Sequence, residues 1–215
     1  MAILSPQEKR KKEKENKRNN ILKAARKLFF DRGFKAVTVD SIADRAGVSK
    51  GSIYLYFDSK EEIYAQVLIA DNIERHKDLL NFETKEAPAD QLLFEYAERY
   101  VNNFLNDNEL FRILMTFMLQ TEQMNLTPQQ NAELIRTTND NIKFISHILQ
   151  KGVDQGLFSP AIDIRQTQNA IWGLLNGIIS LFLFLGNPAR RAEKIHSLVK
   201  DGLNIFVKGL KKTDS

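Results

Sequence analysis

Apolar residues recur at intervals of three and four along most of the chain, and this spacing is the strongest constraint on its fold. Residues spaced in this way lie on one face of an α-helix. The first series ends at Gly33, a residue type that commonly terminates helices, and consists of Ile21, Leu22, Ala25, Leu28 and Phe29. No segment shows the sustained alternation that is typical of a half-buried β-strand. The sequence therefore predicts an all-α fold.

The same spacing predicts about nine helices. All five prolines lie between them, where proline can begin or end a helix without interrupting one. Thr127-Pro128 and Asn187-Pro188 each place an N-cap residue before a proline at the first helical position, while Gly156 and Gly186 stand at expected helix ends. The predicted ranges are 18–32, 39–46, 50–56, 60–82, 89–106, 109–121, 128–154, 163–185 and 188–210.

Composition excludes several classes of protein. The 215 residues include no cysteine, so disulfides, thiolate metal sites and cysteine nucleophiles are ruled out. A hydrophobic content of 43% rules out wholesale disorder. The first twenty residues are charged and lack the apolar segment of a secretory signal, so we expect a cytoplasmic protein.

The charges are distributed unevenly between the two ends of the chain. Residues 1–60 contain 15 Lys and Arg against 7 Asp and Glu, a balance of +8. The remaining residues contain 16 against 20, a balance of −4. This asymmetry indicates a polyanion-binding module joined to a larger domain, although a solvated lysine-rich tail explains the charge equally well. We expect a flexible basic tail over 1–17, a polyanion-binding domain over 18–62 and a larger helical domain over 63–215.

The segment 170–185, AIWGLLNGIISLFLFL, is the most apolar part of the chain. It is shorter than the roughly 20 residues that cross a membrane, and Asn176 and Ser180 interrupt it. Gly173 and Gly177 would allow another helix to approach closely. We expect this helix to be buried between others or shared between two subunits; a membrane-associated interaction protein is the alternative.

The segment 38–57, TVDSIADRAGVSKGSIYLYF, predicts a helix-turn-helix. A short helix ends at Gly47, which can supply the positive φ of a tight turn, and Ser49 caps a second helix. Ile53 and Phe57 face inward on that second helix. The exposed side keeps a cation, two small residues and two tyrosines, which suits a helix that enters the major groove of DNA better than an ordinary helical hairpin.

Residues 21–68 resemble the TetR (tetracycline-repressor) family of bacterial transcription regulators. The family pattern is present as Ala24-Ala25, Leu28-Phe29, Gly33-Phe34, Thr38-Val39, Ile42-Ala43, the run AGVSKG at 46–51, Tyr54 with Phe57, and the run KEE at 60–62. The position before Phe57, often histidine in the family, is Tyr56. The match covers about a quarter of the chain, and the remainder resembles the family only in helix count and apolar rhythm.

The resemblance implies a DNA-contacting surface. Most of these contacts would position the protein on phosphates, whereas Lys50, Gly51 and Ser52 are the best candidates for base contact. A free N–H group and the helix dipole favour phosphate at the start of the second helix. The implied residues are Thr38, Ser49, Lys50, Gly51, Ser52, Tyr54, Tyr56 and Lys60. The preceding run KRKKEKENKR either adds non-specific or minor-groove affinity or is merely solvated.

The resemblance also implies a homodimer formed by the last two helices. The sequence agrees, because an apolar face on the last helix beside the apolar 163–185 helix would leave a large exposed patch on a monomer. Pairing with a two-fold copy would bury that patch. The expected interface residues are Ile195, Leu198, Val199, Gly202 and Phe206.

A pocket for a small effector is expected inside the larger domain. Asn176 and Ser180 interrupt an apolar run, and buried polar groups require partners from a neighbouring helix or a ligand. Few charges fall on these stripes, so a mainly apolar ligand such as a fatty-acyl compound or a hydrophobic drug is expected. The candidate lining is Tyr96, Tyr100, Phe104, Phe111, Met115, Met118, Trp172, Asn176 and Ser180, each of which is also compatible with an ordinary core.

No enzymatic site is indicated. His76, His147 and His196 lie on separate predicted helices, without a metal-binding spacing, a nucleophile motif or a phosphate-binding glycine loop. We expect neither a cofactor nor a metal. The sequence therefore predicts a ligand-responsive DNA-binding regulator, most simply a repressor that binds a palindromic operator as a dimer. An architectural or protein-controlled DNA-binding protein without a small effector is the alternative.

Overall fold

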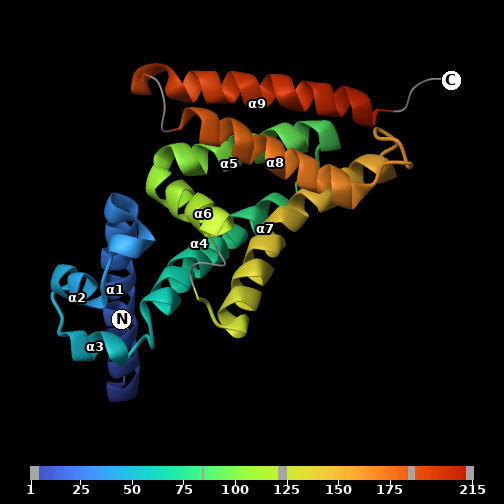
Figure 1. The fold of residues 1–215 in the computed structure, drawn as a ribbon. Coiled ribbons are helices and arrows are strands. Elements are labelled where there is room, and N and C mark those ends of the chain that lie inside the picture. The colour runs from blue at the N-terminus through green and yellow to red at the C-terminus, as the bar shows by residue number, and fades with distance from the viewer. Residues whose placement is uncertain (1–4, 84, 121–124, 184–186, 212–215) are drawn as a thin grey trace. The chain divides into compact units, whose positions relative to one another are not determined.

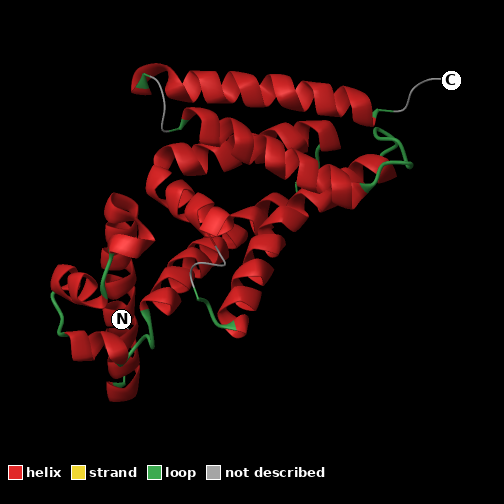
Figure 2. Ribbon diagram, in the orientation of Figure 1, coloured by secondary structure: helices red, strands yellow, loops and turns green. Residues whose placement is uncertain are grey.

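The computed structural model describes residues 5–83, 85–120, 125–183 and 187–211. Over these ranges the chain consists of helices joined by loops (Figures 1 and 2). Within them no strand forms, and Phe158 and Lys211 make one isolated bridge. The prediction of an all-α fold is confirmed. The helices are α1 (Pro6–Ala36), α2 (Val39–Ala46), α3 (Lys50–Tyr54), α4 (Lys60–Glu83), α5 (Ala89–Asn106), α6 (Asn108–Gln120), α7 (Pro128–Asp154), α8 (Ile164–Phe182) and α9 (Pro188–Leu210).

The helix boundaries follow the sequence signals closely. The predicted ranges 39–46, 89–106, 128–154 and 188–210 coincide with α2, α5, α7 and α9. Gly156 adopts a φ of 71° just after α7, which confirms its predicted role as a helix stop. The ends predicted at residues 121 and 185, and the stop at Gly186, lie outside the described residues.

The start of α1 differs from the prediction. The helix begins at Pro6 and not at residue 18, so residues 6–17 are helical where a flexible tail was expected. Ser5 caps the first turn, because Glu8 N–H donates to Ser5 Oγ at 3.3 Å and Ser5 N–H donates to Glu8 Oε2 at 2.7 Å. This reciprocal pair is a capping box, and Pro6 stands at the first helical position. Near the other end, Gly33 (φ 75°, ψ 163°) interrupts the helical geometry, as predicted.

The chain divides into two compact units, which we call the head unit and the body unit. The head unit comprises residues 1–72 and 109–136, and the body unit comprises residues 73–108 and 137–215. The first part of α4, all but the first residue of α6 and the start of α7 thus belong to the head unit together with α1 to α3.

The head unit has an aromatic core around Tyr64. The ring of Tyr64 meets Phe29 at 4.9 Å and Phe34 at 5.2 Å between centroids, both edge to face. Its hydroxyl donates to the carbonyl of Ile113 in α6 at 2.6 Å. Burial raises the pKa of Tyr64 well above its ordinary value. The apolar stripe that begins at Ile21 packs into this core, as the sequence predicts.

The body unit is built around α5, α8 and α9. Helix α9 runs along α8 and also packs on α5 (Figure 1). The two helices approach closely at Gly202, where an added Cβ would lie 3.0 Å from Leu174 Cδ2. Gly152 on α7 likewise leaves room for the ring of Phe158, which would collide with a Cβ at that position. The part of its core that α8 and α9 contribute includes Ile171, Leu175, Ile179, Ile195, Val199 and Leu203.

Candidate nucleic-acid interface and body core

Local hydrogen bonds shape each bend of the helix-turn-helix. Thr38 caps α2, since Ser41 N–H donates to Thr38 Oγ1 and Thr38 N–H donates to Ser41 Oγ, both at 3.1 Å. Gly47 ends α2 with a φ of 67°, the left-handed conformation that the sequence predicts. Ser49 then caps α3 by accepting a hydrogen bond from Ser52 N–H at 3.2 Å.

The two sides of this motif differ sharply in exposure. Ile53 and Phe57 are buried, as predicted. The helix predicted over 50–56 is shorter, however, because α3 ends at Tyr54 and Phe57 lies beyond it. On the outer side, Thr38, Ser49, Lys50, Gly51 and Tyr54 are exposed, while Ser52, Tyr56 and Lys60 are half-buried. Five of the eight residues predicted to contact DNA are thus exposed. Their contact with DNA stays a prediction.

Polar groups on this surface are already paired with one another. The Ser49 and Ser52 hydroxyls lie 2.9 Å apart, so one donates to the other. The Lys50 ammonium donates to Asp40 Oδ2 at 2.9 Å, and this contact raises the pKa of Lys50 above its ordinary value. Both side chains of the ion pair are more than half exposed. A phosphate approaching Lys50 would therefore meet the carboxylate of Asp40 as a competitor.

Lys60 has a structural partner inside the head unit. Its ammonium donates to the backbone carbonyl of Phe34 at 2.9 Å and lies 4.3 Å from the centroid of the Phe34 ring. An ammonium has three donors, so these contacts leave capacity for a phosphate. Lys60 therefore helps to hold α4 against α1. Its contact with phosphate stays a prediction.

Sequence reasoning missed two residues that shape this interface. One is Asp40, the partner of Lys50, which the sequence identifies only as an acidic residue in the first turn of a helix. Arg18 donates to Gln66 at 2.5 Å and lies 5.3 Å from the centroid of the Phe57 ring, which fixes α1 against the segment after α3. No local pattern connects residues so far apart in the chain.

In the body unit, the predicted aromatic series on α5 is present. The rings of Tyr96 and Tyr100 stack at 6.1 Å, and Tyr100 meets Phe104 edge to face at 5.1 Å. The Tyr100 hydroxyl donates to Asn176 Oδ1 at 2.9 Å, and Asn176 Nδ2 donates to the Trp172 carbonyl at 2.8 Å. The buried amide of Asn176 thus obtains partners from α5 and from its own helix.

The remaining predicted ligand contacts lie in different surroundings. Trp172 is half-buried and Ser180 is exposed. Phe111 is buried, Met115 half-buried and Met118 exposed, and all three belong to the head unit. A single pocket lined by all nine residues stays a prediction.

The proposed dimer face is partly occupied by the chain itself. Ile195 and Val199 are buried within the body unit, and Leu198, Gly202 and Phe206 are half-buried. The exposed apolar side chains of α8 and α9 are instead Leu181, 60% exposed, and Ile205, 74% exposed. Gly173 and Gly177 on α8 face open space, since an added Cβ would meet no atom within 4 Å.

The histidines occupy three separate positions. His76 and His147 each meet the ring of Phe144 edge to face, at 5.4 Å and 6.1 Å. His196 Nε2 lies 3.0 Å from Asn102 Oδ1. In the part of the chain that the structure describes, no group of His, Asp and Glu is arranged to hold a metal ion, and no helix is long and apolar enough to span a membrane.

A helix-turn-helix joined to a larger helical unit defines a class of DNA-binding transcription regulators, and comparison with known proteins identifies the family. The family model for bacterial regulatory proteins of the tetR family matches residues 21–67. The HTH-type transcriptional repressor KstR2 of Mycolicibacterium smegmatis is 31% identical over 156 residues, which cover 69% of this chain and 71% of that protein. The fatty acid metabolism regulator protein of Bacillus subtilis is 27% identical over 173 residues, which cover 80% and 86% of the two chains.

A solved structure shows the same fold. The transcriptional regulator FadR from Bacillus subtilis in complex with stearoyl-CoA aligns with a TM-score of 0.73 at 20% identity, covering 89% of this chain and 98% of that one. The chain belongs to the TetR family of bacterial transcription regulators. Its function is that of a bacterial transcriptional regulator.

Proposed function

We propose that the protein binds a palindromic operator as a homodimer and leaves it when a small, mainly apolar effector binds. The observation that carries this proposal is the two-sided helix-turn-helix, with Ile53 and Phe57 buried and Ser49, Lys50 and Gly51 exposed. Residues 18–62 form the DNA-binding domain, and residues 63–215 bind the effector and dimerise. The site of action is the cytoplasm, where a bacterial chromosome is accessible, and we assign the protein no catalytic activity.

DNA recognition rests on short polar contacts at α3. Gly51 and Ser52 are small enough to let the backbone approach base edges, and Lys50 can exchange its carboxylate partner for phosphate or a base. Thr38 and the two tyrosines contribute phosphate contacts, which fix the position without reading sequence. In successive major grooves, the two α3 helices of a dimer would lie about 34–36 Å apart.

The dimer forms through α8 and α9. Leu181 and Ile205 provide exposed apolar contacts, and open surface at Gly173 and Gly177 permits close packing of a second helix. Replacing Ile205 by Asp would place a charge in this interface and should dissociate the dimer in analytical ultracentrifugation. Leu119→Asp, at an apolar position on α6 that is 81% exposed, is the matched control and should stay dimeric. A dimeric Ile205→Asp protein would contradict this placement.

The effector is proposed to be a long-chain acyl compound. Two comparisons support this class: the match to a fatty acid metabolism regulator of Bacillus subtilis, and the match to a regulator from the same organism solved with stearoyl-CoA. The body core offers aromatic rings at Tyr96, Tyr100 and Phe104, which suits contact with an alkyl chain. The effector changes DNA affinity only by its differential affinity for two conformations, so a hundredfold release requires about 2.7 kcal/mol.

The test begins with selection of genomic fragments by the purified protein. Fluorescence anisotropy of a selected duplex is then titrated with stearoyl-CoA, with free coenzyme A and stearate as controls. We expect one inverted repeat to be enriched and stearoyl-CoA to weaken binding at least tenfold. Enrichment without any effect of the three compounds would favour the alternative, a regulator controlled by a protein partner. The absence of enrichment would contradict operator binding itself.

A further inference from the structure

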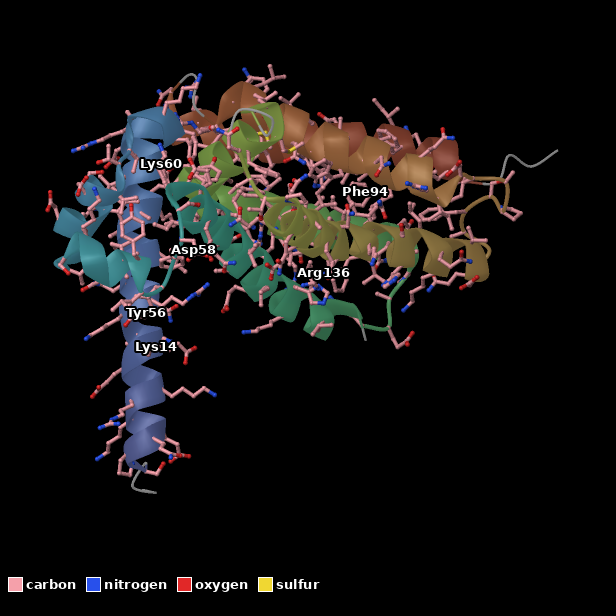
Figure 3. All side chains as sticks on the ribbon, turned by 60° about the horizontal axis from the view of Figure 1, so that its bottom comes forward. Lys14, Tyr56, Asp58, Lys60, Phe94 and Arg136 are labelled. Atoms are coloured by element: carbon pink, nitrogen blue, oxygen red, sulfur yellow. The ribbon has the colours of Figure 1, made fainter. Side chains whose placement is uncertain are left out.

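The N-terminal part of α1 carries a concentration of positive charge outside the helix-turn-helix. Between Pro6 and Arg18 the chain has seven Lys and Arg against three Glu. Residues 6–17 are all exposed, and at 1.5 Å per residue they extend the helix by roughly 18 Å. Figure 3 shows Lys14 on this extension, beyond the part of α1 that α2 and α3 cover.

The charges are not spread evenly around the helix. At about 100° per residue, five cations fall within an arc of about 120° that holds no acidic residue. Glu8, Glu13 and Glu15 all lie outside this arc. We call the five cations the basic stripe: Arg10, Lys11, Lys14, Lys17 and Arg18.

Contacts at one end of the basic stripe show which way it faces. Arg18 reaches Gln66 on α4 and the ring of Phe57, just after α3. Lys11 and Lys14 lie within about 40° of Arg18 around the helix axis. The same arc continues into the buried series that begins at Ile21. The basic stripe therefore prolongs the face of α1 on which the helix-turn-helix packs.

We propose that the basic stripe is a second DNA-binding element, which contacts the sugar–phosphate backbone beside the groove that α3 occupies. The polyanion matches the four exposed cations of the stripe, Arg10, Lys11, Lys14 and Lys17, on a preformed helix. Each phosphate that they neutralise releases condensed counterions. Around Lys11 and Lys14 the helix has no small residues that would let its backbone approach base edges. The stripe therefore adds affinity that does not depend on sequence. This inference rests on the DNA binding of the family, and it extends the contact surface beyond residues 18–62.

The chain offers a closely matched pair of variants. Lys11→Gln/Lys14→Gln removes two charges from the basic stripe, whereas Lys9→Gln/Lys12→Gln removes two charges from the same helical turns outside it. Lys9 lies about 180° from Arg18 and Lys12 about 120°. Glutamine and lysine have similar helix propensities, so α1 should persist in both variants, as circular dichroism would verify.

Affinity is measured with the full-length protein between 50 and 300 mM salt, on the selected operator and on a duplex of random sequence. At about 0.9 per phosphate, the stripe variant should have a log–log salt slope shallower by up to about 1.8 per chain. Its affinity for both duplexes should fall roughly tenfold near 150 mM salt, with the ranking of sequences unchanged. The control variant should stay within about threefold of the unaltered protein, since its lysines contribute only through general charge.

Equal losses in the two variants would overturn the proposal, because overall charge would then explain the effect. Unchanged binding in both would overturn it as well, and would mean that the extension is simply solvated. Loss of binding to vesicles containing phosphatidylserine, with DNA binding intact, would assign the stripe to a lipid surface instead. The duplex of random sequence separates this test from the test of the proposed operator. Binding of the stripe to that duplex can be measured whether or not an operator is found.

Discussion

Tyr64 allows the packing of the head unit to be tested by the removal of one oxygen atom. Its side chain is 1% exposed, and its hydroxyl donates to the carbonyl of Ile113, which is 2% exposed. Tyr64→Phe deletes this hydrogen bond and keeps the edge-to-face contacts with Phe29 and Phe34. The substitution therefore isolates the link between α4 and α6 from the aromatic core around it.

The expected cost follows from what is removed. A neutral hydrogen bond contributes about 1 kcal/mol net, and no cavity forms because the ring remains. Tyr64→Phe should therefore lower the free energy of unfolding by about 1 kcal/mol at neutral pH. Tyr64→Ala, which also removes the ring, should cost about 3–5 kcal/mol.

The pH dependence gives a second and independent check. Burial raises the pKa of Tyr64 in the folded state, so the folded protein retains a phenolic proton that the unfolded chain releases above about pH 10. Tyr64 therefore stabilises the fold fully below pH 10, and this stabilisation is lost as the pH rises further. At about 1.4 kcal/mol per pH unit, the advantage of the unaltered protein over Tyr64→Phe should vanish between about pH 10 and 11.

Urea unfolding followed by circular dichroism measures this difference. The single tryptophan, Trp172, lies in the body unit, so its fluorescence reports that unit separately. Tyr54→Phe removes an exposed hydroxyl and should change stability by less than about 0.5 kcal/mol. The assigned role of the Tyr64 hydroxyl would be refuted by equal stability of Tyr64→Phe and the unaltered protein at neutral pH. A stability difference that persists unchanged to pH 11 would refute the argument from burial.

Three further experiments, with four substitutions, follow from individual contacts. Asp40→Asn removes the carboxylate that competes for Lys50 and should strengthen operator binding several-fold at low salt, measured by anisotropy. Gly152→Ala forces a methyl group into a packed ring and should destabilise the body unit by about 1–3 kcal/mol, measured by tryptophan fluorescence in urea. Tyr100→Phe and Asn176→Leu should each cost about 1–3 kcal/mol, while the double variant should cost less than their sum, giving a coupling energy of at least about 0.5 kcal/mol.

The parts of the fold that were predictable are those encoded within a few residues. Thr38, Gly47 and Ser49 determine the helix-turn-helix through caps and a positive φ, each of which involves neighbours within about five positions. The start of α1 was predictable in the same way, because Ser5 and Glu8 form a capping box that the sequence contains. The low complexity of the following residues obscured that signal.

The parts that were not predictable depend on tertiary pairing. The sequence indicates that Asn176 requires a polar partner, but Tyr100, 76 positions away, becomes its partner only through the packing of α5 on α8. Spacing likewise places Ile195 and Val199 on an apolar face without revealing which surface covers it. In the structure they are buried within their own chain. Whether an apolar face meets the chain itself or a second subunit is decided by packing that periodicity does not encode.

Helix α6 has two contacts that constrain any response to an effector. Tyr64 of α4 is bonded to its backbone at Ile113, and Lys27 of α1 pairs with Glu109 at 2.6 Å. The buried hydrogen bond weakens steeply if its atoms separate or tilt, whereas the half-exposed ion pair tolerates movement and is screened by salt. A shift of α6 would therefore pull on α4 through Tyr64 more strongly than on α1 through Lys27. The response to effector should accordingly diminish in Tyr64→Phe and persist in Glu109→Gln.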